Sequence, residues 1–245
     1  LVGTRLSAPT RESAQPAVHG TEAAVASEHS IAVLPFDNFS ADPAQAYFAD
    51  GITEDLITDL ARLPGLIVIA RHSSFAYKGK QVIPQQVARE LGVRYLLEGS
   101  VQRQGDRLRI NAQLIDALSG QHLWADRYGG TMNDVFAVQD KVIGEIVAAL
   151  QLKLPDTTGR RETSNPAAYD ALLQGLERLR QGSEAETIAA IKAFERAVAL
   201  DPDYARAHAL LAAAHWQIVS STWESASGAG FQNANDSMRK HLALA

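Results

Sequence analysis

Apolar residues recur along the first part of the chain with two different periods. Ile31 to Phe36 is a short, continuous apolar run, which is typical of a buried strand. The next apolar positions repeat every three or four residues: Ile52, Leu56, Leu60 and Leu63. This spacing predicts one stripe of an amphipathic helix, which Pro64-Gly65 would end. Leu66 to Ala70 reads as a second buried strand.

A second helix and three consecutive strands are predicted next. Pro84 to Leu91 has a proline in its first turn and Gly92 at its end, which favours a helix. Three strands follow, at residues 95–102, 107–114 and 121–128, and the middle one alternates strictly between apolar and polar residues. Short turns join them, so we expect antiparallel neighbours.

The order of these elements predicts the fold class. A last helix is expected from Met132 to Leu152, which completes the order β-α-β-α-β-β-β-α. Two crossovers followed by a meander predict an α+β fold, with a layer of helices on a mixed sheet. We assign this α+β domain to residues 30–152.

The last third of the chain is rich in alanine and predicted to be all helical. Residues 153–166 form a polar break, interpreted as a linker, and residues 167–245 follow the spacing of tetratricopeptide-type repeats. The positions expected to pack the repeat are Gly175, Ala190, Phe194, Ala197, Pro202 and Ala212. One repeat and the start of another are present, so we expect the array either to continue past Ala245 or to rest on the α+β domain.

The ends of the sequence suggest a piece of a longer protein. Residues 1–29 are rich in Ala, Pro, Ser, Thr and Glu, without a sustained period, which predicts a flexible linker. The chain begins at Leu1 instead of methionine and stops inside a predicted helix. We therefore expect part of the function to reside in residues beyond this sequence.

Charge and composition exclude several classes of function. The net charge is −5, from 23 basic and 28 acidic residues, and no segment has the basic excess that direct nucleic-acid binding needs. Cysteine is absent, which excludes disulfides, thiolate zinc sites and a cysteine nucleophile. No apolar run approaches the roughly 20 residues that span a bilayer, and no signal peptide is visible.

The common catalytic motifs are also missing, and the remaining clusters are ambiguous. Asp50, Glu54, Asp55 and Asp59 lie on the first predicted helix. They suit a metal or acid–base site, but we favour a solvated helix face, because negative charge is stabilised near a helix N-terminus. His208 and His215 are seven residues apart, which is too far for the four-residue offset of helical zinc sites. We therefore predict no catalytic residue, no metal and no cofactor.

A ligand site is conceivable after the second predicted strand. Its candidate residues are Arg71, Ser73, Ser74, Tyr77 and Lys78. Hydroxyl groups and cations at the carboxyl end of a strand can hold an anion or a small ligand. The alternative is an ordinary loop with a basic patch.

Five ordered blocks of sequence resemble a known family. They are Ser30 to Ser40, Tyr47 to Leu56, Ile69 to Phe75, Glu90 to Val101 and Gly120 to Tyr128. The blocks are similar to the TolB-N-like (FlgO-like) domain of bacterial signalling proteins, which stands ahead of tetratricopeptide repeats there as here.

The resemblance implies a signalling role without catalysis in this chain. In such proteins the output domain is a class III adenylate/guanylate cyclase or a winged-helix DNA-binding domain, as in CadC-like regulators. We expect a non-catalytic regulatory and sensory region whose repeats bind a protein partner, in a full-length protein of either type. Leu1-Val2-Gly3 would suit the end of an upstream membrane helix. The compartment, on the cytoplasmic or periplasmic side of the inner membrane, and the oligomeric state stay open.

Overall fold

The computed structural model describes residues 28–152, 162–222, 236 and 238–240. Most of the predicted linker at 1–29, and residues 153–161 of the predicted break, lie outside the described residues. The predicted limits of the domains therefore stay predictions. Below, residues 28–152 are called the α+β half and residues 162–222 the helical half.

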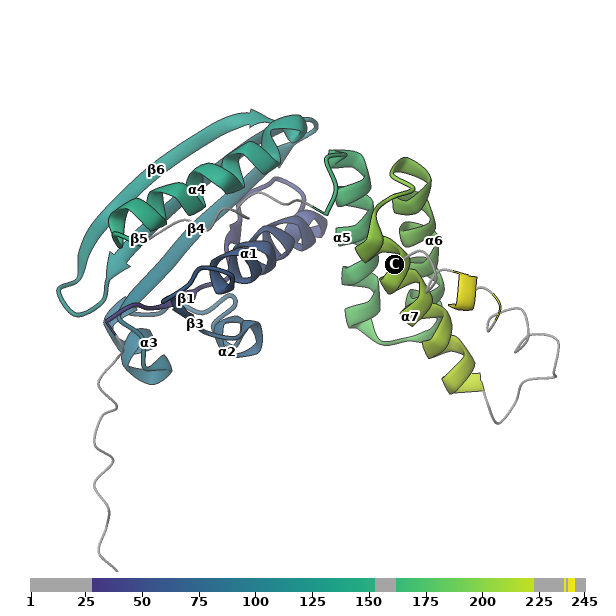
Figure 1. Cartoon of the computed structure of the whole chain (residues 1–245), viewed down its shortest axis with the longest axis horizontal. Helices are drawn as coiled ribbons and strands as arrows, with labels where there is room; N and C mark the ends of the chain where they lie inside the picture. Colours follow the sequence, from purple (N-terminus) through teal and green to yellow (C-terminus); the bar gives the residue numbers. More distant parts are fainter. Residues whose placement is uncertain (1–27, 153–161, 223–235, 237, 241–245) are drawn as a thin grey trace, which may run out of the picture.

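One mixed sheet forms the centre of the α+β half (Figure 1). Its strands are β1 (Ser30–Val33), β2 (Asp37–Asn38), β3 (Ile67–Val68), β4 (Tyr95–Gln104), β5 (Arg107–Asp116) and β6 (Gln121–Thr131). The order is β3-β1-β4-β5-β6, with β2 also pairing with β4. β1 is parallel to β3 and β4, whereas β4, β5 and β6 are antiparallel. The predicted α+β fold with a mixed sheet is confirmed.

Helices cover both faces of this sheet unequally. The helical segments are η1 (Pro43–Gln45), α1 (Ala46–Ala61), α2 (Arg71–Phe75), α3 (Pro84–Leu91), η2 (Met132–Asp134) and α4 (Val135–Ala149). α1 and α4 lie on one face (Figure 1) and bury the large core that includes Ile31, Val33 and Leu97. α3 lies on the other face, over the smaller cluster of Ala32 and Leu34. Adjacent strand residues therefore enter different cores, as strand geometry requires.

A proline separates β1 from β2 and redirects one backbone amide. Pro35 cannot donate to the sheet, and the next N–H, that of Phe36, donates instead to Oγ1 of Thr53 at 3.0 Å. Thr53 lies on α1, and its own hydroxyl donates to the carbonyl of Ala49 at 2.9 Å. The interruption in the strand is thus satisfied by the helix packed against it.

Two of the predicted elements in this half are wrong in detail. The second strand was expected to be buried over Leu66 to Ala70, but β3 is two residues long and Ile67 is 54% exposed. It lies at the edge of the sheet, where one side has no neighbouring strand to cover it. The ligand segment expected to be a loop begins with the short helix α2. In contrast, α3 spans the predicted residues, and Gly92 ends it in the left-handed region, at φ 68°.

Three helices make up the helical half: α5 (Pro166–Gln181), α6 (Glu184–Leu200) and α7 (Ala205–Thr222). The side chain of Asn165 accepts hydrogen bonds from two amides in the first turn of α5, and that of Ser183 accepts one from the amide of Glu186 in α6. Gly182 takes the left-handed conformation that lets the chain reverse between α5 and α6. The C-terminal helical region is therefore confirmed.

A continuous hydrophobic core joins the two halves. Tyr169 and Leu173 of α5 belong to the same buried cluster as Phe48 of α1 and Phe136 of α4. The three helices accordingly stand against the end of the α+β half that carries α1 (Figure 1). Within the described part of the chain, no helix has both the length and the apolar character needed to cross a membrane.

Candidate functional site

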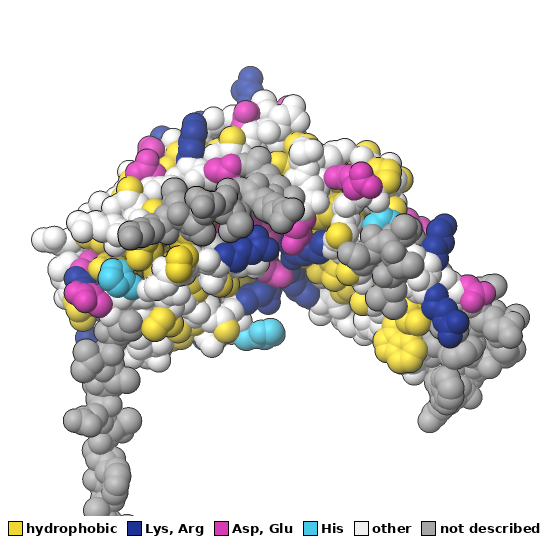
Figure 2. All heavy atoms as spheres, in the orientation of Figure 1, with side chains coloured by type: hydrophobic (Ala, Val, Ile, Leu, Met, Phe, Trp, Pro, Cys, Tyr) yellow, Lys and Arg dark blue, Asp and Glu magenta, His cyan; other side chains and the backbone are white. Residues whose placement is uncertain are grey.

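The acidic face of α1 is where the two halves of the chain meet. A solvated face was predicted for its four carboxylates, but the structure covers three of them. The side chains of Asp50, Glu54 and Asp55 are 5%, 23% and 16% exposed, respectively. They are covered because α2 and its following loop approach from one side, while α5 and α7 approach from the other. We call this contact surface the junction, and Figure 2 shows basic and acidic side chains gathered there between the halves.

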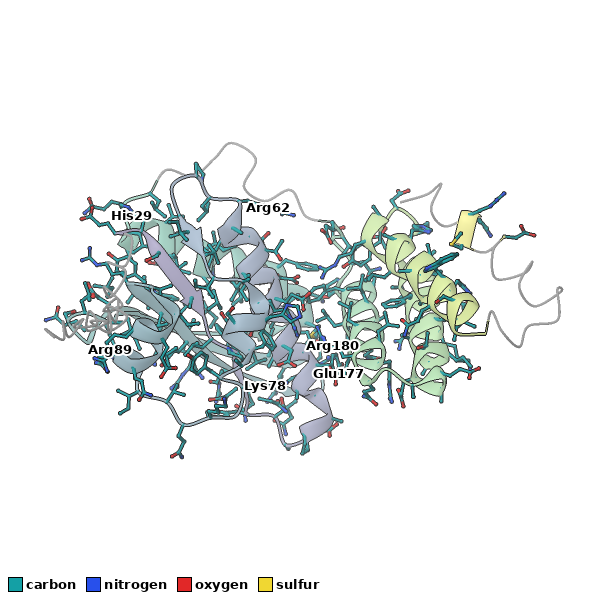
Figure 3. All side chains as sticks on the ribbon, turned by 90° about the horizontal axis from the view of Figure 1, so that it is seen from below. His29, Arg62, Lys78, Arg89, Glu177 and Arg180 are labelled. Atoms are coloured by element: carbon teal, nitrogen blue, oxygen red, sulfur yellow. The ribbon has the colours of Figure 1, made fainter. Side chains whose placement is uncertain are left out.

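Glu54 is the centre of the junction, because arginines from three elements reach it. Arg180 of α5 and Arg71 of α2 place guanidinium nitrogens 2.8 Å and 2.9 Å from its Oε2. Arg206 of α7 lies 3.6 Å from the other carboxylate oxygen. Arg180 is seen in Figure 3 at the end of α5, beside the α+β half and not far from Lys78. One carboxylate therefore ties α1 to α2, α5 and α7 at once.

Asp55 extends the junction into the core. It accepts a hydrogen bond from the hydroxyl of Tyr169 at 2.5 Å and one from Arg206 at 3.1 Å. Burial raises the pKa of the Asp55 carboxyl, and Arg206 and Tyr169 limit that rise. Burial, and then the charge of Asp55, raise the pKa of Tyr169 well above its ordinary value, so this phenol stays a hydrogen-bond donor.

A second cluster of polar side chains surrounds Asp170 of α5. Arg103 of β4 approaches both of its carboxylate oxygens, at 2.7 Å and 3.4 Å, in the forked geometry that guanidinium groups favour. The hydroxyl of Tyr47 donates to the same carboxylate at 2.8 Å, and the amide of Gln174 donates at 3.0 Å. Burial, assisted by Asp170, raises the pKa of Tyr47 to about 12.

Apolar side chains of α1, α4 and α5 also pack together where the halves meet. Leu173 of α5 packs onto Gly51 of α1, where an added Cβ would lie 2.5 Å from the Leu173 methyl groups. The rings of Phe48 and Phe136 meet Tyr169 edge-on, at centroid distances of 6.4 Å and 5.2 Å. The junction therefore combines a packed apolar centre with hydrogen-bonded ion pairs, which is the composition of a fixed interface.

The structure divides the five predicted ligand residues between different surroundings. Arg71 and Lys78 contact the α1 carboxylates Glu54 and Asp50, whereas the Tyr77 hydroxyl donates to Glu90 of α3 at 2.5 Å. Ser73 is exposed on α2. Ser74 is fully buried, and its hydroxyl has no hydrogen-bond partner among the described residues. The five side chains do not converge on one point.

The predicted repeat residues lie mainly between α5, α6 and α7. Ala190, Phe194 and Ala197 of α6 are fully buried, and Ala212 of α7 is 2% exposed. An added Cβ on Gly175 would lie 2.4 Å from the ring of Phe194, so the two helices are as close as a glycine allows. Pro202 is exposed in the turn before α7.

The two histidines are separated in the structure as the sequence spacing indicates. His208 is 2% exposed, and its Nε2 lies 2.8 Å from the carbonyl of Pro202. His215 is half-buried, and burial lowers its pKa. The described residues include no group of three His, Cys, Asp or Glu side chains placed to hold a metal ion.

Sequence reasoning missed the partners of the acidic face. Arg103, Tyr169, Asp170, Arg180 and Arg206 were not singled out, although they hold the halves together. A weak signal was available, because residues 169, 170, 173, 174, 177 and 180 share one face of α5 at helical spacing. The sequence alone predicts that polar side chains on a helix face are exposed to solvent, unless a helix packed against that face is known.

Comparison with known proteins identifies the two parts of the chain separately. Residues 27–154 match the family described as HilA/YgeH-like transcriptional regulator, second domain, which the sequence resemblance had not named. Residues 188–219 match a TPR repeat family, as the sequence predicted.

A relative comes from Rhizobium meliloti (strain 1021) and is named "Putative adenylate cyclase 3". It is 54% identical over 188 residues, which make up 74% of this chain and 32% of that protein. The chain thus spans about a third of the length of this relative.

Solved structures give more distant likenesses. TolB from Acinetobacter baumannii is 20% identical, with a TM-score of 0.37 over 49% of this chain and 28% of TolB. Lipoprotein GNA1162 from Neisseria meningitidis is 19% identical, with a TM-score of 0.37 over 49% of this chain and 98% of that protein. Likenesses at this level carry no argument about function. The family match to residues 27–154, in contrast, covers more than half of the 245 residues, and the chain therefore belongs to the HilA/YgeH-like transcriptional regulator second-domain family.

Proposed function

We propose that this chain is a non-catalytic regulatory and protein-interaction region of a bacterial adenylate/guanylate cyclase-type signalling protein. The relative named as an adenylate cyclase supports the signalling context, because it is 54% identical over most of this chain. The TPR match supports protein interaction, since stacked helical repeats present extended surfaces to partners.

The junction is the observation that carries this proposal. The carboxylates of α1 that a hydrolytic or metal-dependent site would need are engaged by Arg71, Arg180 and Arg206. The contacts of Arg180 and Arg206 also attach α5 and α7 to the α+β half. A partner that binds α5, α6 or α7 can therefore influence the α+β half through the junction.

A second candidate function follows from the family description. The matched family is named for a transcriptional regulator, which favours the same region serving as the sensor of a winged-helix regulator. In that case an upstream domain would bind DNA, and this chain, with its net charge of −5, would not.

The test begins with the native open reading frame upstream of Leu1, followed by assays of its full-length product. We expect an upstream cyclase domain, cyclic AMP formation by the full-length protein, and none by residues 1–245 alone. A winged helix with a DNA mobility shift and no cyclase activity would replace the first proposal with the second. Cyclic AMP formation by the isolated chain would overturn both.

A matched pair of arginines tests whether the junction transmits regulation. In the full-length protein, Arg180→Glu places a carboxylate against Glu54 and should change the rate of cyclic AMP formation. Arg178→Glu, two residues away, alters only the contact with Glu186 inside the helical half and should leave that rate unchanged. Equal rates for wild type and both variants would contradict a regulatory junction.

A further inference from the structure

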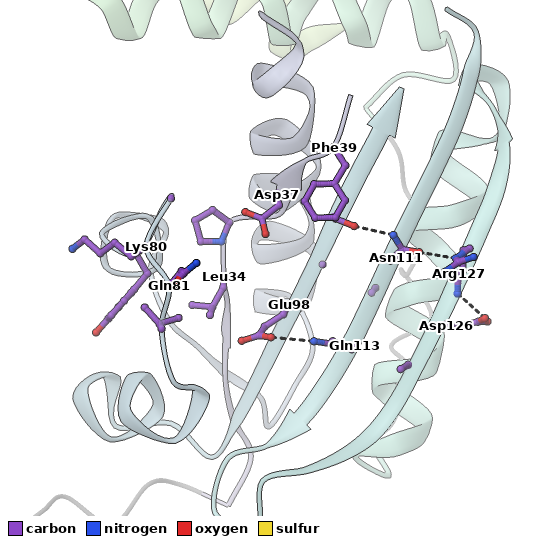
Figure 4. A pocket seen from close by; sticks show the side chains of 18 residues that line it. Leu34, Asp37, Phe39, Lys80, Gln81, Glu98, Asn111, Gln113, Asp126 and Arg127 are labelled. Atoms are coloured by element: carbon purple, nitrogen blue, oxygen red, sulfur yellow. Dashed lines mark hydrogen bonds between the residues drawn. The ribbon is translucent and has the colours of Figure 1, made fainter. Parts of the chain in front are cut away.

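A groove of about 760 Å³ lies on the face of the sheet opposite α1 and α4 (Figure 4). β4, β5 and β6 form its floor, and residues 77–82, between α2 and α3, form one wall. Leu34, Asp37 and Phe39 also line it, and Figure 4 shows Leu34 and Asp37 between this wall and the side chains of β5 and β6. Its volume falls within the range of roughly 300–1,000 Å³ that is usual for sites of small ligands.

The floor of this groove is polar, whereas the neighbouring part of the same sheet face, under α3, is apolar. Under α3 the face carries Leu34 and Leu96, which are buried by that helix. Beyond α3 the residues on β4 and β5 become polar and form pairs across the strands. Gln113 donates to Glu98 at 3.1 Å, and Asn111 donates to Ser100 at 2.8 Å. An apolar helix or partner packed here would bury these polar groups away from water, which costs free energy. This face therefore does not suit an apolar partner.

The floor groups retain capacity for a ligand. Arg127 of β6 donates through Nε to the side-chain amide oxygen Oδ1 of Asn111 at 3.0 Å, which leaves the other guanidinium nitrogens available. Glu98 has a carboxylate oxygen beyond the one that Gln113 uses. Figure 4 shows these side chains along one side of the groove and Lys80 and Gln81 along the other. The arrangement offers amide, carboxylate and guanidinium groups on a rigid sheet.

The charges in the groove are nearly balanced. Asp37, Glu98 and Asp126 line it together with Lys80 and Arg127. Among the residues that the structure describes, no ion pair joins any of these carboxylates to either cation, in contrast to the junction. An anionic ligand such as a nucleotide needs a basic excess, and a polycation needs an acidic one. The lining therefore favours a ligand with no net charge and many hydrogen-bonding groups.

An aromatic ring stands at the mouth of the groove. Phe39 is 63% exposed at the end of β2, although its neighbour Phe36 is buried in the core. An exposed ring next to planar hydrogen-bonding groups suits a ligand with an apolar C–H face and hydroxyls at its edge. Adjacent hydroxyls can each share hydrogen bonds with a carboxylate, an amide or a guanidinium group.

We propose that this groove binds a short, neutral saccharide, with Phe39 against a sugar face and the floor residues Glu98, Asn111, Gln113 and Arg127 bonded to its hydroxyls. The proposal does not depend on the regulatory function above, because the groove lies on the other face of the sheet from α1. The wall of the groove nevertheless includes Tyr77, one residue from the Lys78 that contacts Asp50 of α1.

Titration of the isotope-labelled chain, followed by amide NMR shifts, tests this proposal. The probes are cellotriose, maltotriose and tri-N-acetylchitotriose, with triglycine and adenosine monophosphate as zwitterionic and anionic comparisons. We expect saturable shifts at groove residues with at least one trisaccharide. We expect none with the nucleotide, which is anionic, and none with triglycine, which has no net charge but lacks hydroxyls and an apolar ring face. Asn111→Ala and Phe39→Ala should each weaken binding by about tenfold, which is the order expected for one or two lost contacts.

Leu118→Ala is the matched control, because Leu118 is 75% exposed in the turn after β5 and does not line the groove. It should leave the affinity unchanged. If the amide spectrum of Asn111→Ala loses its dispersion, that variant is unfolded and Gln113→Ala is tested instead. The proposal would be overturned if none of the three trisaccharides gave saturable shifts, or if triglycine or the nucleotide bound equally well. It would also be overturned if Leu118→Ala lost as much affinity as the groove variants.

Discussion

At Gly175 the backbone of α5 approaches α6 so closely that a hydrogen atom is the largest side chain that fits. A methyl group there would lie 2.4 Å from the ring of Phe194, which is fully buried. Gly144 of α4 is the opposite case, because an added Cβ there would meet no atom within 4 Å. The same residue type thus serves close packing at one position and has no such role at the other.

We predict that Gly175→Ala destabilises the protein by about 1–3 kcal/mol, the usual cost of overpacking a core. Gly144→Ala should stabilise it by about 0.5–1 kcal/mol, since alanine loses less backbone entropy than glycine in a helix interior. Urea unfolding of both variants checks the prediction. An unchanged free energy of unfolding for Gly175→Ala would show that α5 and α6 can separate at little cost.

Asp59, at the last turn of α1, makes stability depend on pH. Burial raises the pKa of its carboxyl to about 6, and Asp55, Asp140 and Glu162 add to the rise while Arg62 opposes it. A carboxyl with a raised pKa in the folded state binds more protons than the unfolded chain does between its two pKa values. Its contribution to stability is therefore complete at low pH and falls as the pH rises from about 4 to about 6.

Asp59→Asn should remove this loss. The free energy of unfolding of the variant, minus that of wild type, should therefore be larger at about pH 8 than at about pH 4. Thermal unfolding at both pH values measures the difference. Asp134→Asn should behave in the opposite way, because hydrogen bonds from Thr131 lower the pKa of that carboxyl. The same pH slope in wild type and Asp59→Asn would contradict the assignment.

At the scale of elements, α1 makes different contacts on each of its sides. Its apolar stripe, which includes Ile52 and Leu56, covers the sheet as the spacing predicts. Thr53 satisfies the amide that the sheet leaves unpaired at Phe36, and Gly51 accepts Leu173 of α5. Only the contact with the sheet follows from periodicity, because each of the others requires a partner distant in sequence.

We predict that Thr53→Val costs about 1–3 kcal/mol in the free energy of unfolding, because it leaves the buried amide of Phe36 without an acceptor. Thr58→Val is the control on the same helix. Its hydroxyl also donates to the helix backbone, at 2.9 Å from the carbonyl of Glu54, but it is exposed. We expect that change to stay within about 0.5 kcal/mol. Similar losses of unfolding free energy in both variants would attribute the cost to valine within the helix and not to the unpaired amide of Phe36.

Over the whole molecule, the junction makes one body of two dissimilar halves. Its ion pairs are partly exposed, so solvent screens the attraction within each pair. Glu54 differs from an ordinary surface carboxylate because Arg71, Arg180 and Arg206 all reach it. The junction also includes an apolar contact, because Leu173 of α5 packs directly onto Gly51 of α1.

A double-mutant cycle with Glu54→Gln and Arg180→Gln should give a coupling energy of about 0.5–1.5 kcal/mol, measured by chemical unfolding. The same arginine also contacts Glu177, four-tenths exposed and on its own helix, at 3.2 Å. The cycle for Arg180 with Glu177 should give no more than about 0.5 kcal/mol. If the two coupling energies were equal, Arg180 would not connect the halves.

The sequence by itself determined the local structure of this protein. The strict alternation in residues 107–114 specified β5, because a strand with one covered face needs that period. The proline and glycine at its ends delimited α3, since each acts on the backbone next to it. The spacing from Ala190 to Pro202 identified the repeat helix, and the family match covers the same region. These signals involve residues that are near one another along the chain.

Only the tertiary structure decided what covers the acidic face of α1 and where the sheet stays open. Glu54 and Arg180 are 126 positions apart, and Asp55 and Arg206 are 151 apart. A charged residue on an outer helix face has the same pattern whether water or another helix lies against it. The same holds for the groove, whose residues come from strands that the sheet order brings together and from the segment 77–82 that packs beside them. Pairing between distant segments depends on packing free energy summed over many contacts, which no local period records.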